Sequence, residues 1–112
     1  MLPSSVRILV CTEPQDMRRS FDRLAEVART VMGEEPQSGT LFVFVGKRPT
    51  RVKILWWDRN GYCLLYKRLH RALFTAPTAA DGARSVRIDG AALAQLLEGV
   101  AREEKRHQRR LH

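Results

Sequence analysis

The sequence predicts an α+β fold in which an antiparallel sheet of about four to five strands, with a central three-strand meander, packs with two helices. Short apolar runs rich in β-branched and aromatic residues alternate with polar turns, which indicates strands. Two other segments repeat apolar residues at intervals of three and four, which indicates amphipathic helices. A chain of 112 residues supports one core. We therefore expect a single domain over residues 1–100 and a basic tail or helix extension over residues 101–112.

The first strand and the first helix are predicted near the amino terminus. Residues 5–11 (SVRILVC) have the composition of a strand, and residues 12–15 interrupt it. Asp16 is then placed to cap a helix that ends near Gly33. The apolar stripe of this helix comprises Met17, Phe21, Leu24, Ala28 and Val31. We expect the helix to lie between the first and second strands in the chain order.

The meander is predicted over the middle of the chain. Residues 41–45 (LFVFV) indicate a buried strand, and residues 46–50 turn the chain into a hairpin over residues 51–68. The hairpin turn lies in Asp58-Arg59-Asn60-Gly61, because Asn-Gly is a strong signal for a tight turn. Either Arg59-Asn60 or Asn60-Gly61 forms its central pair.

The last elements follow a turn-rich connection over residues 75–83. Residues 85–88 form a candidate short strand, and Asp89 is placed to cap a second helix. The apolar positions of that helix are Leu93, Leu96, Leu97 and Val100.

The charge balance favours a polyanionic partner. Twenty Lys and Arg residues against twelve Asp and Glu residues give a formal net charge of +8. No apolar run reaches the ~18 residues of a membrane span, and the amino terminus lacks a secretory signal, so we expect a cytoplasmic protein without membrane contact. Cys11 and Cys63 are expected to be reduced, and the three histidines share no ligand spacing with them. We expect neither a metal site nor a cofactor.

Cationic residues are predicted to converge at one end of the meander, where antiparallel strands bring the turn over residues 46–51 beside the end of the hairpin. Interleaved cations and aromatics are typical of nucleic-acid surfaces. The predicted nucleic-acid-binding residues are Lys47, Arg48, Arg51, Lys53, Trp57, Tyr66, Lys67, Arg68 and Arg71.

The two consecutive tryptophans must point to opposite faces of the sheet. Trp56 shares its face with Val52 and Ile54 and is expected to be buried against a helix. Trp57 is the candidate for an exposed stacking platform, the alternative being that it packs beneath the second helix.

The acidic residues have structural explanations, so no catalytic residue is predicted. Asp16 and Asp89 are placed as caps, and Asp58 and Asp81 lie in turns. On the first helix, Asp22 and Glu26 are spaced to pair with Arg18 and Arg29. The sequence contains no glycine-rich phosphate loop, no HExxH motif and no elbow serine.

Four sequence blocks also carry a family resemblance. They are DMRRSFDRL, LFVFVGKR, KILWWD followed by NG, and LLYKRL. In order and spacing they resemble the Orf2-type (TnpB) accessory protein of the insertion sequence 66 family of transposable elements, from about Val6 to Leu97. Two positions depart from the family pattern, which commonly has glycine at Arg59 and an acidic residue at His70.

The resemblance implies a noncatalytic protein that assists transposition by a separate, larger transposase bearing the catalytic carboxylates. Together with the basic surface it gives a first hypothesis, a DNA-binding accessory factor that contacts element ends or target DNA. The alternative is a protein-interaction subunit that binds the transposase, or its own copies, through the aromatic sheet face. A contiguous apolar patch around Trp57 and Tyr66 would favour this alternative, whereas a cationic concavity would favour DNA.

Overall fold

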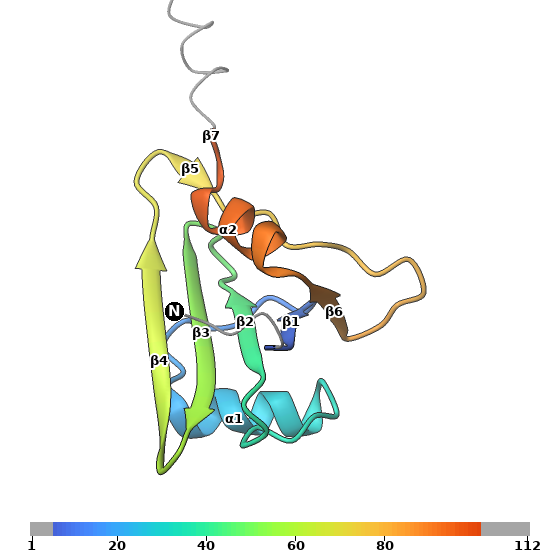
Figure 1. Cartoon of the computed structure of the whole chain (residues 1–112). Coiled ribbons are helices and arrows are strands. Elements are labelled where there is room, and N and C mark those ends of the chain that lie inside the picture. Colours follow the sequence, from blue (N-terminus) through green and yellow to red (C-terminus); the bar gives the residue numbers. More distant parts are fainter. Residues whose placement is uncertain (1–5, 102–112) are drawn as a thin grey trace, which may run out of the picture.

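The computed structural model describes residues 6–101 and confirms the α+β fold (Figure 1). The main sheet has the order β4-β3-β2-β1-β6. Its strands are β1 (Ile8–Cys11), β2 (Leu41–Val45), β3 (Arg51–Asp58), β4 (Gly61–Arg68) and β6 (Ser85–Ile88). The helices are α1 (Phe21–Thr30) and α2 (Gly90–Glu98). A second small sheet, which the sequence did not predict, pairs β5 (Ala72–Leu73) with β7 (Val100–Ala101).

The predicted meander is confirmed, and one other strand pair is parallel. Strands β2, β3 and β4 are successive antiparallel neighbours. Strand β1 runs parallel to β2, because α1 carries the chain from the end of β1 back to the start of β2. Strand β6 pairs antiparallel with β1 at the far edge. The sheet is therefore mixed, although most of its pairs are antiparallel.

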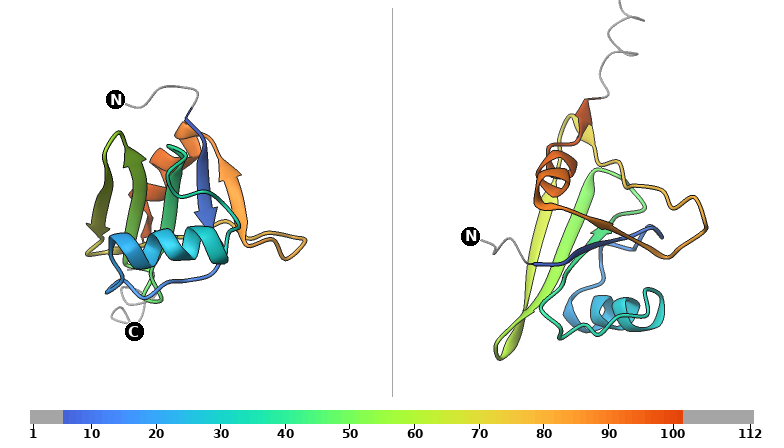
Figure 2. Two further views of the ribbon diagram at one scale, coloured as in Figure 1. Left: turned by 90° about the horizontal axis from the view of Figure 1, so that it is seen from below. Right: turned by 45° about the vertical axis from the view of Figure 1, so that its right-hand side comes forward.

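The two helices cover opposite faces of the sheet (Figure 2), and each face has its own apolar cluster. On the α1 face the sheet contributes Leu9, Cys11, Phe42, Phe44 and Leu55. On the α2 face it contributes Ile8, Val10, Leu41, Val43, Val45, Val52 and Ile54. Strands β1 and β2 are thus buried on both faces, which explains why their sequences are continuously apolar.

Helix α1 begins later than the sequence predicted. Ser20 precedes its first residue, and Asp16 lies outside the helix, where its carboxylate accepts the Arg18 backbone N–H at 2.9 Å. The delay arises because Gln15 is tied to the sheet: its N–H bonds the Val45 carbonyl, and its carbonyl accepts the Lys47 N–H. A backbone held extended beside β2 cannot enter a helix until it has left the sheet.

The predicted α1 stripe is correct in its centre and wrong at its start. Leu24 and Ala28 are buried, whereas Phe21 is 43% exposed. Met17 still packs against the α1 cluster, but from the connecting segment. Arg18 pairs with Asp16 at 2.6 Å and not with Asp22 as predicted.

The capping prediction for α2 is confirmed, and its last apolar position is wrong. The Asp89 carboxylate accepts the Ala92 N–H at 2.8 Å. The helix ends at Glu98 and is followed by Gly99, whose φ of 76° is unfavourable for other residues. Val100 therefore leaves the helical stripe, joins β7 and is 61% exposed.

Candidate nucleic-acid interface

The cationic end of the β3–β4 hairpin is the candidate interface, and its geometry confirms the expected convergence. Arg51 and Arg68 are cross-strand partners at the open end of the hairpin. The turn between β2 and β3 starts there at Gly46, where an added Cβ would lie 2.7 Å from Met17 Cγ and 2.9 Å from the Arg48 carbonyl oxygen. Only glycine therefore allows the Lys47-Arg48 turn to lie this close to the preceding segment.

A concavity of about 470 Å³ opens beside this turn. Its lining residues are Gln15, Asp16, Met17, Arg18, Lys47, Arg48 and Arg51. The hydrogen bonds of the Arg18 guanidinium and backbone hold the pKa of the Asp16 carboxyl well below its usual range, so this carboxylate stays ionised and paired. Because Arg18 offsets Asp16, the net positive charge of the concavity comes from Lys47, Arg48 and Arg51.

Arg51 joins this concavity to a second one of about 300 Å³, which Tyr66 and Arg68 also line. Arg51 Nη1 donates a hydrogen bond to the Tyr66 hydroxyl at 3.2 Å. The tyrosine thus lies beside half-buried Arg51 and exposed Arg68, on the same side of the sheet. Five residues of the predicted set therefore line one continuous surface: Lys47, Arg48, Arg51, Tyr66 and Arg68.

Two predicted lysines are committed to contacts within the protein. Lys53 is only 6% exposed, and its Nζ donates to the Arg19 carbonyl at 2.6 Å. Lys67 is exposed on the opposite face of the sheet, where its Nζ donates to the Leu97 carbonyl at 2.8 Å, near the end of α2. A cation at this position also complements the negative end of the helix dipole. Lys53 therefore does not belong to the surface, and Lys67 faces away from its centre.

The structure separates Trp57 from the cations. Trp57 lies six positions along β3 from Arg51, which is roughly 20 Å in an extended strand. It is half-buried and packs edge-on against Tyr62, with ring centroids 5.0 Å apart. Trp56 is also half-buried and packs against the α2 cluster, on the side that the sequence predicted.

Arg71 lies near the cationic end, and Arg18 is an addition to the predicted set. The segment after β4 returns past the β2–β3 turn, because Leu69 N–H bonds the Thr50 carbonyl and Phe74 N–H bonds the Pro49 carbonyl. Arg71 is exposed on this segment. Local sequence patterns do not predict Arg18 at this site, since its position depends on the long-range bridge between Gln15 and Gly46.

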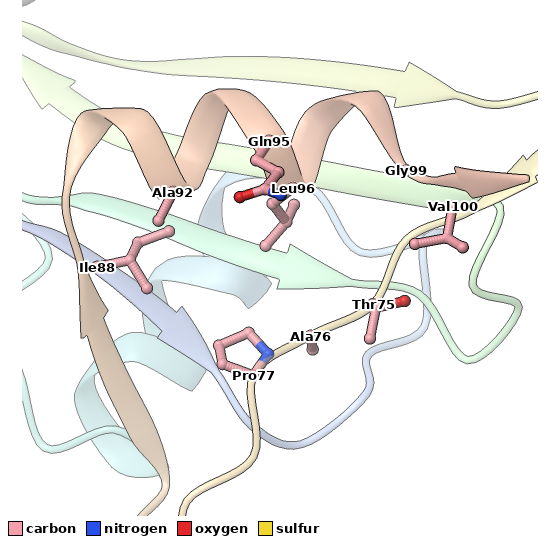
Figure 3. A pocket seen from close by; sticks show the side chains of 9 residues that line it. All are labelled: Thr75, Ala76, Pro77, Ile88, Ala92, Gln95, Leu96, Gly99 and Val100. Carbon is pink, nitrogen blue, oxygen red and sulfur yellow. The ribbon is translucent and has the colours of Figure 1, made fainter.

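Another concavity, of about 310 Å³, lies between α2 and the connection after β5 (Figure 3). Its lining residues are Thr75, Ala76, Pro77, Ile88, Ala92, Gln95, Leu96, Gly99 and Val100. None of them is charged, so this hollow does not extend the basic surface.

Neither a metal cluster nor a spanning helix is found over residues 6–101. No three His, Cys, Asp or Glu side chains in this part of the chain are arranged to hold a metal ion. None of its helices has the length and apolarity that crossing a membrane requires.

Two residues outside the cationic surface have structural roles. Burial raises the pKa of the Cys11 thiol, which therefore stays protonated. The Asp81 carboxylate accepts the Ala83 N–H at 3.0 Å, as its predicted turn role requires.

Comparison with known proteins gives a consistent result over nearly the whole chain. The family model described as "IS66 Orf2 like protein" matches residues 6–107. The uncharacterized protein y4hO of Sinorhizobium fredii (strain NBRC 101917 / NGR234) is 41% identical over 102 residues, which cover 89% of this chain and 87% of that protein. The uncharacterized protein y4jC of the same strain is 36% identical over 78 residues, covering 70% and 67% of the two chains. No solved structure is significantly similar.

Proposed function

Because the chain belongs to the family of IS66 Orf2-like proteins, we propose that it is a noncatalytic DNA-binding protein that assists a separate, larger transposase. Family membership makes it an accessory protein of a transposable element. The DNA contact and the partnership with the transposase are the proposed parts. Element ends and target DNA are the candidate ligands.

The observation that carries the proposal is the concave cationic surface at the open end of the hairpin. Lys47, Arg48, Arg51 and Arg68 line two concavities that share Arg51. The one acid among the lining residues, Asp16, is already paired with Arg18. A surface of this kind can neutralise several phosphates, and the net charge of +8 attracts a polyanion from solution.

The protein-interaction alternative is less well supported. It requires a contiguous apolar patch around Trp57 and Tyr66, but Trp57 is half-buried against Tyr62. In the described part of the chain, the exposed large apolar side chains are Phe21, Leu65, Tyr66 and Val100. Leu65 and Tyr66 are consecutive in β4 and so point to opposite faces. Leu65 therefore cannot join Tyr66 in one patch on that face of the sheet.

DNA titrations at two salt concentrations test the proposal. Changing Arg48, Arg51 and Arg68 together to Gln should weaken binding to duplex DNA of the element ends and lower the salt slope by about 2.7, at about 0.9 per phosphate contact. The matched control changes Arg23, Arg29 and Arg87, which are exposed elsewhere, to Gln. This control removes the same charge and should leave the slope nearly unchanged. An equal fall in both triple variants would show that net charge, and not this surface, governs binding.

The absence of catalysis has its own test. Two-metal phosphoryl transfer needs acidic ligands that converge on ions about 4 Å apart. In residues 6–101 the acids form no such group. Purified protein with Mg²⁺ or Mn²⁺ is expected neither to nick nor to join DNA. Metal-dependent cleavage that disappears in the Asp22→Asn or Asp58→Asn variant would overturn the noncatalytic assignment.

A further inference from the structure

Tyr66 is an exposed aromatic side chain that the protein holds in one orientation. It is 49% exposed near the end of edge strand β4. Its hydroxyl accepts a hydrogen bond from Arg51 at 3.2 Å, and Lys53 Nζ lies over its ring, 4.7 Å from the centroid. Lys53 is itself fixed by its 2.6 Å bond to the Arg19 carbonyl. The ring is therefore fixed at its hydroxyl and on one face, and about half of the residue remains open to solvent.

The surroundings of this ring are cationic. Arg51 and Arg68 line the same 300 Å³ concavity as Tyr66. Arg51 also lines the larger concavity, which Lys47 and Arg48 share. A ring that one base can stack on, with guanidinium groups beside it for the adjoining phosphates, is the combination that single-stranded nucleic acids require.

The hairpin contains a second aromatic site with a different environment. Trp57 and Tyr62 pack against each other and have no cation beside them in the described contacts. Each of these two rings is packed against the other, whereas the exposed part of the Tyr66 ring contacts no other aromatic ring in the described residues. Within the hairpin, only Tyr66 therefore combines exposure, a fixed ring and neighbouring cations.

Building on the proposed DNA binding, we infer that the cationic end binds single-stranded DNA and that Tyr66 stacks on an unpaired base. In a duplex each base is already stacked on its neighbours, and only its edges are accessible from the grooves. In a single strand the faces of the bases are open, so a ring on a sheet surface can stack on them. Because the ring is already fixed, stacking costs little further side-chain entropy.

The test compares three probes: an oligodeoxythymidine of about twelve nucleotides, an abasic strand of the same length, and a duplex. The abasic strand keeps the phosphates and removes the bases. Wild-type protein should bind oligodeoxythymidine more tightly than the abasic strand. Tyr66→Leu should lose about 5- to 150-fold in affinity for oligodeoxythymidine and change little on the abasic strand. Tyr66→Phe, which keeps the ring, should retain most of the preference.

Tyr62→Leu is the matched control, because it removes the other tyrosine on the same face of β4 and leaves the cations in place. It should keep the preference for bases, and thermal melts establish that each variant is folded. Equal, salt-dependent binding of all three probes by wild-type protein would overturn the stacking inference and leave the proposed DNA binding intact. A failure to bind any probe would overturn both.

Discussion

The two ends of the β3–β4 hairpin are built from the same strands and have different chemistry. At the closed end, Trp57 and Tyr62 are cross-strand partners that pack edge-on beside the turn. At the open end, Tyr66 is exposed beside Arg51 and Arg68. Each end has aromatic side chains on the α1 face of the sheet. Only the open end places cations around an exposed ring.

This difference shows that the position along a strand matters as much as the face. Alternation along the strands correctly places Trp57 and Tyr66 on one face. Tyr66 is the cross-strand partner of Lys53, as Tyr62 is of Trp57, and Lys53 and Trp57 lie on the same face of β3. Trp57 is nevertheless roughly 20 Å from Arg51 along the strand, too far to share one phosphate. The closed end is thus a packing site, and the open end is the candidate for binding.

The largest expected effect is on stability, from truncating the two tryptophans. Trp56→Ala should lower the free energy of unfolding by about 3 kcal/mol, because Trp56 packs against the α2 cluster. Trp57→Ala should cost about 1 to 2 kcal/mol, mainly the pairing with Tyr62. Urea unfolding measures both values. DNA affinity of the folded variants should be unchanged, and weaker DNA binding by Trp57→Ala would assign the closed end a binding role.

Lys53→Met tests whether the buried lysine stabilises the fold beneath the open end without contacting DNA. The variant keeps most of the side-chain volume and leaves the Arg19 carbonyl without its donor. We expect the free energy of unfolding to fall by about 2 kcal/mol. The salt slope of DNA binding should stay the same, because a side chain that is 6% exposed reaches no phosphate. A slope lower by about 0.9 would show that Lys53 contacts DNA directly.

At the closed end, Arg59→Gly should stabilise the protein by about 1 kcal/mol. Asp58 pairs with Gly61, so Arg59-Asn60 is the central turn pair, and Arg59 has a φ of 58°. A left-handed conformation is costly for arginine and free for glycine, which outweighs the greater entropy of glycine in the unfolded chain. Asn60→Gly is the control, since Asn60 has no positive φ to relieve. Thermal melts compare the two, and equal shifts would contradict this account.

Local patterns predicted the elements whose causes are local. The strand over residues 41–45 and the Asp89 cap follow from neighbouring residues, and both are confirmed. The start of α1 was not predictable in this way, because the bridge between Gln15 and Gly46 delays it across 31 positions of the chain. The pairing of β5 with β7 is likewise long-range, between segments of two residues each.

The candidate site was predicted in part for the same reason. The convergence of Arg51 and Arg68 follows from hairpin geometry and is confirmed. Residue type alone could not show that Lys53 is buried, because its burial depends on the carbonyl of Arg19 in the segment before α1. The stacking of Tyr66 on an unpaired base stays a prediction, which the comparison of the single-stranded, abasic and duplex probes tests.

The smallest effect is expected from Lys67→Gln, which separates two neighbouring cations on β4. Lys67 donates to the Leu97 carbonyl on the α2 face, whereas Arg68 lines the concavity on the other face. Lys67→Gln should cost about 0.5 kcal/mol of stability through the helix end and leave the salt slope unchanged. Arg68→Gln should do the reverse, lowering the slope by about 0.9 with little loss of stability. If Lys67→Gln lowers the slope as much as Arg68→Gln does, DNA passes around the edge of β4 and contacts both faces of the sheet. The open end would then act as an edge that the strand wraps, and not as a single concave surface.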